Sequence, residues 1–320
     1  MELKNKKIII TGGAGLVGSE LCRLLCKDNK VIIFDTFEKG TENMAKEMPR
    51  PENVTLVKGD VMNYEDLDNA MKGCDIIYHL ASIIGITTVT KRPTLTIEVS
   101  LVGTQNALKS ALKHKLKRFF FTSTSEVYGP MAYNRSEEDF TSQGPLSEPR
   151  WYYATAKLTA ENLIHAYHRE YGLPITTVRL HNIYGEGQLG EGAIGMFIKR
   201  AIRNEPLTIY GQGNQIRAWC HVSDCARALV LLADDKAIGH CVNIGNPYET
   251  PSIYQLAKMI IALTGSKSEI QFEDKFSEKG DVFLRVPEIT KLKKMTGYEP
   301  KVFLDEGLKR TIEAFKKRFL

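Results

Sequence analysis

The stretch Thr11–Gly18, which reads TGGAGLVG, decides the fold of this 320-residue chain. It follows the apolar run Lys7–Ile10 and opens the amphipathic run Leu16–Lys27. A glycine-rich turn between a strand and a helix is typical of a site for the phosphates of a dinucleotide. The stretch therefore predicts the first strand and helix of a dinucleotide-binding sheet.

Each glycine of this turn has a physical reason. Gly12 permits the tight turn, Gly15 lets the backbone approach a pyrophosphate, and Gly18 lets helix and strand pack closely. The first N–H groups of the helix, around Leu16 and Val17, then point at the phosphates. We expect these five residues to bind the cofactor.

Further apolar runs without polar alternation extend the pattern, and such runs predict strands covered on both faces. They are Val31–Phe34, Val54–Val57, Ile76–Leu80, Arg118–Thr122 and Ile175–Arg179. Amphipathic runs between them predict helices at Tyr64–Lys72, Leu95–Lys113 and Tyr153–Tyr171. Strands that alternate with helices predict an α/β fold with a Rossmann-like, doubly wound parallel sheet.

The rhythm changes after about residue 180. We expect a loop at Gly185–Gly195, strands at Leu207–Tyr210 and Val242–Ile244, and helices at Ala193–Arg203, Val222–Asp234, Ser252–Thr264 and Asp305–Phe319. The strand at Val242–Ile244 can rejoin the main sheet. The expected domains are 1–180 with about 215–246 for the dinucleotide, and a smaller discontinuous lobe of about 181–214 and 247–320 for substrate.

Bulk composition excludes several classes of protein. A formal charge of +5 on 320 residues is too small to indicate a nucleic-acid binder. No apolar run approaches the length that spans a bilayer, and Ile8–Ile10 is too short for a secretory signal. The six cysteines form no metal-binding pattern. We expect a cytoplasmic protein with reduced thiols, no metal, and no nucleic-acid or membrane partner.

Polar residues at strand ends extend the cofactor site. Asp35 ends the second strand, where a carboxylate accepts hydrogen bonds from the adenosine ribose and repels a 2′-phosphate, which favours NAD over NADP. A role in a turn or cap is the alternative for Asp35. Asp60 and Val61 are expected beside the adenine. Leu80, Ala81 and Ser82, which follow the fourth strand, are expected to line the cofactor.

Tyr153 and Lys157 are the expected reacting pair. They lie four residues apart and so share a helix face. A free tyrosine has a pKa near 10, and a nearby ammonium or a nicotinamide cation favours its phenolate. Tyr153 is then the base that takes the proton of a substrate alcohol, while Lys157 also holds the nicotinamide ribose. Tyr152 is excluded because its partner four residues on is Ala156.

Thr124, Ser125 and Glu126 leave the fifth strand at the same crevice. The Thr124 hydroxyl is placed to hydrogen-bond the substrate oxygen, and Ser125 adds a second hydroxyl. A carboxylate such as Glu126 exceeds what simple hydride transfer requires. We therefore count all three as catalytic, with a solvated glutamate in a polar turn as the alternative.

With these residues in view, the chain resembles the extended short-chain dehydrogenase/reductases, in the NAD-dependent epimerase/dehydratase group acting on nucleotide sugars. The resemblance covers nearly the whole chain. Its motifs are TGGAGLVG, Phe34-Asp35, Gly59-Asp60-Val61, His79-Leu80-Ala81-Ser82, Gly103-Thr104, Ser123–Gly129, Tyr153-x-x-x-Lys157, Arg179–Gly185 and Tyr210–Arg217.

The resemblance implies a shared first step, in which Tyr153 and Thr124 help to oxidise a sugar C4 hydroxyl with NAD. The 4-keto sugar then leads to 4-epimerisation, 4,6-dehydration, decarboxylation of a uronic acid, or release by a 4-dehydrogenase. The segment around Glu126 is similar to UDP-glucuronate decarboxylases and to some sugar 4,6-dehydratases, whereas Pro149–Tyr153 and Arg217-Ala218-Trp219 look more like the decarboxylases. A non-catalytic NAD-sensing regulator is the remaining alternative, although such proteins tend to lose Tyr153 or Lys157.

The resemblance also implies partners and substrate contacts. Asn182 and Arg217 are expected to contact the nucleotide diphosphate-sugar, and Arg285 is expected to pair with its phosphate. The helices Leu95–Lys113 and Tyr153–Tyr171 are expected to form a homodimer interface. The chain departs from the family pattern at three positions, where it carries Ser100, Glu186 and Glu278.

Overall fold

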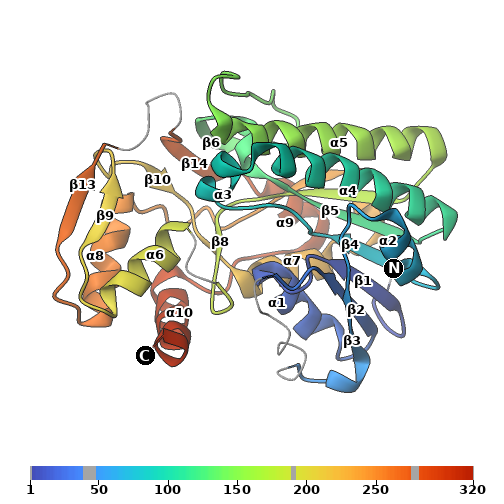
Figure 1. Cartoon of the computed structure of the whole chain (residues 1–320), viewed down its shortest axis with the longest axis horizontal. Coiled ribbons are helices and arrows are strands. Elements are labelled where there is room, and N and C mark those ends of the chain that lie inside the picture. The colour runs from blue at the N-terminus through green and yellow to red at the C-terminus, as the bar shows by residue number, and fades with distance from the viewer. Residues whose placement is uncertain (1, 39–47, 189–191, 275–280, 320) are drawn as a thin grey trace.

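The computed structural model describes residues 2–38, 48–188, 192–274 and 281–319. Its centre is a sheet of seven parallel strands in the order β3-β2-β1-β4-β5-β7-β12 (Figure 1). The strands are β1 (Lys7–Thr11), β2 (Lys30–Asp35), β3 (Val54–Lys58), β4 (Ile76–His79), β5 (Arg118–Thr124), β7 (Ile175–Leu180) and β12 (Cys241–Ile244). The predicted doubly wound parallel sheet is confirmed, and Val242–Ile244 does rejoin it.

Helices cover both faces of this sheet, because its strands alternate apolar side chains between two cores. Ile8 and Ile10 pack with α1 and α7, whereas Ile9 packs on the opposite face with α2, α4 and α5. The helices are α1 (Leu16–Leu25), α2 (Tyr64–Met71), α4 (Pro93–Lys113), α5 (Tyr152–Tyr171) and α7 (Val222–Leu231). Every strand and helix predicted before residue 180 is present, with ends within two residues of those predicted.

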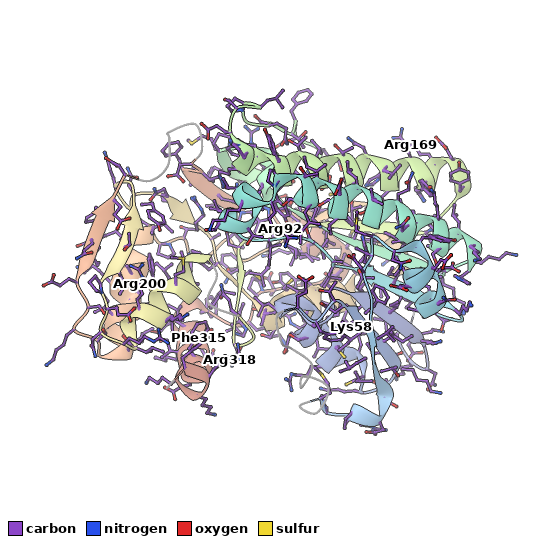
Figure 2. The ribbon with its side chains drawn as sticks, in the orientation of Figure 1. Lys58, Arg92, Arg169, Arg200, Phe315 and Arg318 are labelled. Atoms are coloured by element: carbon purple, nitrogen blue, oxygen red, sulfur yellow. The ribbon has the colours of Figure 1, made fainter. Side chains whose placement is uncertain are left out.

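A smaller core lies beside the sheet, as predicted, and is drawn at the left of Figure 1. It is formed by α6 (Gly192–Ala201), β9 (Leu207–Tyr210), α8 (Ile253–Thr264), β13 (Ile270–Glu273) and α10 (Leu304–Phe319). Figure 2 shows Phe315 of α10 among these elements, and its side chain is 1% exposed. The helix α8 begins at a capping box between Ser252 and Gln255 and ends at Gly265, whose φ is +67°.

A three-stranded parallel sheet, β10-β14-β6, was not predicted. It pairs β6 (Met131–Arg135) and β10 (Ile216–Arg217) with the two edges of β14 (Leu284–Pro287). Most side chains of β6 are exposed, so its sequence lacks the apolar signal of a buried strand. This small sheet matters because it carries Arg217 and Arg285.

Short elements complete the described chain, and sequence patterns had not indicated them. They are α3 (Ile86–Lys91), α9 (Thr290–Thr296), the pair β8 (Ile183–Tyr184) and β11 (Cys220–His221), and the 3-10 turns η2 (Pro51–Asn53), η3 (Ser125–Tyr128), η4 (Pro149–Trp151) and η5 (Asp235–Ala237). Two of these turns matter for the site: η3 directly follows β5, and η4 directly precedes α5.

The strand register brings the predicted residues to one edge. Thr11 pairs with both Phe34 and His79, and Thr124 pairs with Leu180. The carboxyl ends of the central strands are therefore level, and ligands of doubly wound sheets bind beyond this edge.

Candidate active site

The glycine-rich turn forms a cradle that side chains would fill. Gly12 has a φ of +66°, and a Cβ there would lie 2.8 Å from the Ala81 nitrogen. A Cβ on Gly18 would lie 2.6 Å from the Gly13 Cα, so α1 approaches the turn closely. Gly15 is the N-cap of α1 and offers no side-chain cap to the first helical N–H groups. This geometry fits a dinucleotide pyrophosphate above Leu16 and Val17.

Asp35 makes hydrogen bonds that the sequence had offered only as an alternative. Its carboxylate accepts the backbone N–H of Ala14 at 3.0 Å and of Phe37 at 3.1 Å. Asp35 thus ties the glycine-rich turn to the end of β2. A carboxylate has about four acceptor positions, so these two bonds leave room for ribose hydroxyls.

The other predicted cofactor residues surround the same turn. A Cβ on Gly103 of α4 would lie 2.7 Å from Val61, so α4 holds that loop closely. Asp60 accepts the N–H of Met62 and shapes the loop that continues into Val61. Leu80 and Ala81 donate their N–H groups to Thr11, which places the β4 end against the glycine-rich turn.

Tyr153 lies at the start of α5, facing Ser82 and Thr124. Burial raises the pKa of its phenol, the Glu126 carboxylate raises that pKa further, and the two hydroxyls lower it. Ser82 Oγ is buried, and no described residue lies in hydrogen-bonding geometry with it. Ser82, Thr124 and Tyr153 thus bring three hydroxyl groups together at the carboxyl edge of the sheet.

Lys157 is buried on the same helix as Tyr153. Its ammonium donates to the Thr122 carbonyl at 2.8 Å and lies 4.6 Å from the Phe121 ring centre. Burial lowers the pKa of Lys157 to about 7, although the negative charge of Glu161 acts to raise that pKa. Burial and Glu126, rather than this ammonium, dominate the pKa of Tyr153. That Lys157 favours the Tyr153 phenolate stays a prediction.

Glu126 is an ion-paired carboxylate and not a solvated one. Its Oε1 accepts Arg150 Nη2 at 3.2 Å and Arg285 Nη1 at 3.1 Å. Burial opposes ionisation of Glu126, yet the two guanidinium groups and Arg217 outweigh burial and lower its pKa. The neighbouring Ser125 is only 2% exposed.

The arginines at this site are crowded. Burial lowers the pKa of Arg217 to about 9, and the Arg285 charge contributes in the same direction. Arg217 bonds the carbonyl of Val282 and lies 3.9 Å from the Asp281 carboxylate. Arg285 Nε and Nη2 are buried and have no partner among described residues. The cluster therefore holds more positive charge than its own carboxylates neutralise, which suits an anionic ligand.

The structure gives Asn182 a local hydrogen bond. The residue has a φ of +40°, and its amide donates to the Ala218 carbonyl at 2.9 Å. Of the departures from the family pattern, Glu186 lies 3.1 Å from His221, and the buried Ser100 hydroxyl lacks a partner among described residues. Glu278 lies outside the described residues.

Sequence reasoning missed two features. Arg150 was noted in the segment before Tyr153 but received no role, because only the fold brings it to Glu126. His79 bridges Thr11 at 2.7 Å and Thr104 at 3.3 Å beneath the cofactor turn. Burial lowers the His79 pKa to about 3, so the ring is a neutral structural link. The histidine at the end of β4 was the available signal.

Other kinds of site are not found in the part of the chain that the structure describes. Its His, Cys, Asp and Glu side chains form no group that could hold a metal ion. None of its helices is both long enough and apolar enough to cross a bilayer. All six cysteines are free thiols.

Known proteins share this architecture. A model of the NAD dependent epimerase/dehydratase family matches residues 8–245. UDP-N-acetyl-alpha-D-glucosaminuronate decarboxylase of Bacillus cytotoxicus is 37% identical over 98% of both chains. UDP-glucuronic acid decarboxylase 1 of Xenopus tropicalis is 37% identical over 99% of this chain and 73% of its own length.

A solved structure extends the likeness to three dimensions. The UDP-glucuronic acid 4-epimerase of Bacillus cereus, in complex with UDP-glucuronic acid and NAD, is 30% identical, with a TM-score of 0.88 over 98% of this chain and 100% of that one. The family match spans the whole sheet, and the glycine cradle fits the cofactor. The chain therefore belongs to the NAD dependent epimerase/dehydratase family and is an NAD-dependent enzyme.

Proposed function

We propose that this enzyme oxidises C4 of a nucleoside diphosphate uronic acid and then releases the sugar carboxylate as carbon dioxide. The observation that carries the proposal is the cluster of Arg150, Arg217 and Arg285 near Tyr153, whose three positive charges face only the Glu126 and Asp281 carboxylates among the described residues. A sugar that brings its own carboxylate would supply the missing negative charge. Two relatives at 37% identity are named as decarboxylases of such sugars, which supports the same choice.

In the oxidation, Tyr153 takes the proton of the C4 hydroxyl and Thr124 hydrogen-bonds the same oxygen. Bound NAD supplies the acceptor for the hydride that leaves C4. Ser82 lies beside Tyr153 and Thr124. Lys157, one helix turn after Tyr153, holds the nicotinamide ribose. Ionised Tyr153 is the active form, so the oxidation rate rises with pH until the phenol is fully ionised.

In the second step, the new C4 ketone lies β to the C6 carboxylate. The C5–C6 bond breaks, carbon dioxide leaves, and the electron pair of that bond passes into an enolate on C4 and C5. A proton then returns to C5, and return of the hydride to C4 would restore NAD and give a nucleotide pentose that has lost only carbon dioxide. In this step Arg285 binds the sugar carboxylate until carbon dioxide leaves. Glu126 keeps Arg285 in place, and Ser125 packs behind Glu126.

We propose roles for the remaining predicted residues as well. Gly12, Gly15, Gly18 and the N–H groups of Leu16 and Val17 hold the pyrophosphate of NAD, and Asp35 binds the adenosine ribose. Asp60 and Val61 flank the adenine, and Leu80 and Ala81 line the nicotinamide half. Asn182 and Arg217 bind the nucleotide diphosphate.

Product analysis tests this function. The enzyme is incubated with UDP-glucuronate and, separately, with UDP-N-acetylglucosaminuronate, and the products are weighed by mass spectrometry. We expect the loss of carbon dioxide from at least one of them. An unchanged mass with inverted C4 would instead show a 4-epimerase, the activity named for the Bacillus cereus neighbour. Loss of water would show a dehydratase, and loss of two hydrogens a dehydrogenase.

We further propose that residues 1–180 with about 215–246 form the NAD-binding domain and that the rest forms the nucleotide-sugar lobe. The separate core around α6, α8 and α10 supports this division. Six free cysteines suit a reducing compartment, so we place the enzyme in the cytoplasm.

We also propose a homodimer formed through α4 and α5, which lie side by side along the upper edge in Figure 1. Val102 is 38% exposed, and Leu101 and Leu163 are only partly covered. Light scattering should give twice the mass of one chain. Val102→Arg should lower the dimer fraction, because a charge would be buried between the copies, whereas Lys199→Arg on α6 should not. A monomeric wild-type protein would contradict the interface.

A further inference from the structure

Glu126 joins three segments that are distant in sequence. It lies in η3, directly after β5, and its Oε1 accepts hydrogen bonds from Arg150 in η4 and from Arg285 in β14. Since η4 runs straight into α5, the Arg150 bond fixes the start of the helix that carries Tyr153 against the strand end that carries Thr124.

Arg150 is held rigidly. Its guanidinium lies 4.9 Å from the centre of the Trp151 ring, and Trp151 is 1% exposed. A Cβ on Gly144 would lie 2.1 Å from Trp151 Cδ1, so the preceding loop packs directly on the indole. The Arg150 side chain is only 10% exposed, and its Nε and Nη1 have no partner among described residues. The charge of Arg150 is therefore directed at Glu126.

We propose that Arg150 is a positioning residue that sets the proton affinity of Tyr153 through Glu126. The positive charge of Arg150 offsets the negative charge of Glu126 and holds that carboxylate toward the guanidinium groups. The Tyr153 phenol can then lose its proton more easily. This inference rests on the proposed function, in which Tyr153 must ionise. It gives a role to a residue that does not touch the reacting atoms.

The charged surroundings of Tyr153 support this route. Glu126 from η3 raises the pKa of the phenol, and Arg285 from β14 lowers it. Lys157 on the same helix donates to a backbone carbonyl beneath. Arg150 is not among the main direct influences on the phenol, whereas it is the largest charged influence on Glu126.

The sign of the effect follows from Coulomb's law. When Arg150→Met removes one counter-charge, more of the Glu126 charge reaches the phenol, and Tyr153 ionises at a higher pH. Glu126→Gln removes that charge and shifts ionisation to a lower pH. When Glu126→Gln is already present, no Glu126 charge remains for Arg150 to offset. Arg150→Met should then change the pH at which Tyr153 ionises very little.

The test is a titration of Tyr153 in the NAD-bound protein, followed by tyrosinate absorbance. The chain has 13 tyrosines, so each protein is compared with its own Tyr153→Phe counterpart, and the difference isolates one phenol. We expect Arg150→Met to raise the midpoint by about one pH unit, within the range for a nearby charge. Arg150→Lys keeps a positive charge and should therefore give a smaller shift, with a midpoint closer to that of the wild type. Arg135→Met, on exposed β6, is the matched control and should change nothing.

Two outcomes would overturn the inference. One is an unchanged midpoint in Arg150→Met, which would leave Arg150 a structural residue even if activity falls at every pH. The other is an equal shift with and without Glu126. Both results come from titrations that need no turnover. A wild-type enzyme that fails to decarboxylate would therefore contradict the proposed function without affecting this test.

Discussion

Tyr153→Phe is expected to lower the rate at which a nucleotide uronate reduces bound NAD by roughly a thousandfold, since a positioned general base contributes about 10²- to 10⁴-fold. The substitution removes one oxygen and leaves the ring among Ser82, Thr124 and α5. Stopped-flow absorbance of reduced nicotinamide measures the effect. Binding of the substrate should change far less than the rate.

The adjacent tyrosine is the matched control. Tyr152 donates its hydroxyl to the Leu146 carbonyl at 2.8 Å, whereas the hydroxyls beside Tyr153 are those of Ser82 and Thr124. Tyr152→Phe should therefore keep the wild-type rate within about threefold, the size of one modest hydrogen bond. Equal losses in both variants would show that Tyr153 supports the helix and does not take the proton.

Arg285→Gln is expected to lower kcat/KM for a nucleotide uronate by roughly thirtyfold to several thousandfold, since truncation of one buried charged partner costs about 2–5 kcal/mol. The change removes the cation that we assign to the sugar carboxylate and leaves Glu126 with Arg150. The loss should be much smaller for UDP-glucose binding, because that sugar has no carboxylate. Steady-state kinetics and calorimetric binding measure the two effects.

Thermal unfolding separates this loss from misfolding, because Arg285 is buried and paired. Arg135→Gln, on the neighbouring strand of the same small sheet, is the control and should leave both substrates unaffected. A variant of Arg285 that loses affinity equally for charged and neutral sugars would show that the arginine binds the shared nucleotide diphosphate.

The main sheet could be predicted because its signals are local. Ile8, Ile9 and Ile10 are all buried, and a short run that is apolar on both sides indicates a strand with helices on each face. Gly12 and Gly18 marked the turn because only glycine tolerates such close approach. The same reasoning placed Tyr153 and Lys157 on one helix.

The arginine cluster could not be assembled from the sequence. Glu126 and Arg285 are 159 positions apart and meet only because β14 pairs with β6, whose exposed strand carries no apolar pattern. The sequence indicated that Glu126 is unusual, but it did not identify the arginines that pair with Glu126. The lowering of the Lys157 pKa to about 7 could not be predicted for the same reason, since burial depends on the folded surroundings.

If the reaction begins with removal of hydrogen from sugar C4 beside Tyr153, that hydrogen must pass to the cofactor. Single-turnover reaction of UDP-glucuronate deuterated at C4, quenched and analysed by mass spectrometry, follows the hydrogen. We expect one deuterium on the enzyme-bound nicotinamide before product leaves, and its near absence in Tyr153→Phe. Carbon dioxide release while the deuterium stays on the sugar throughout would rule out oxidation at C4.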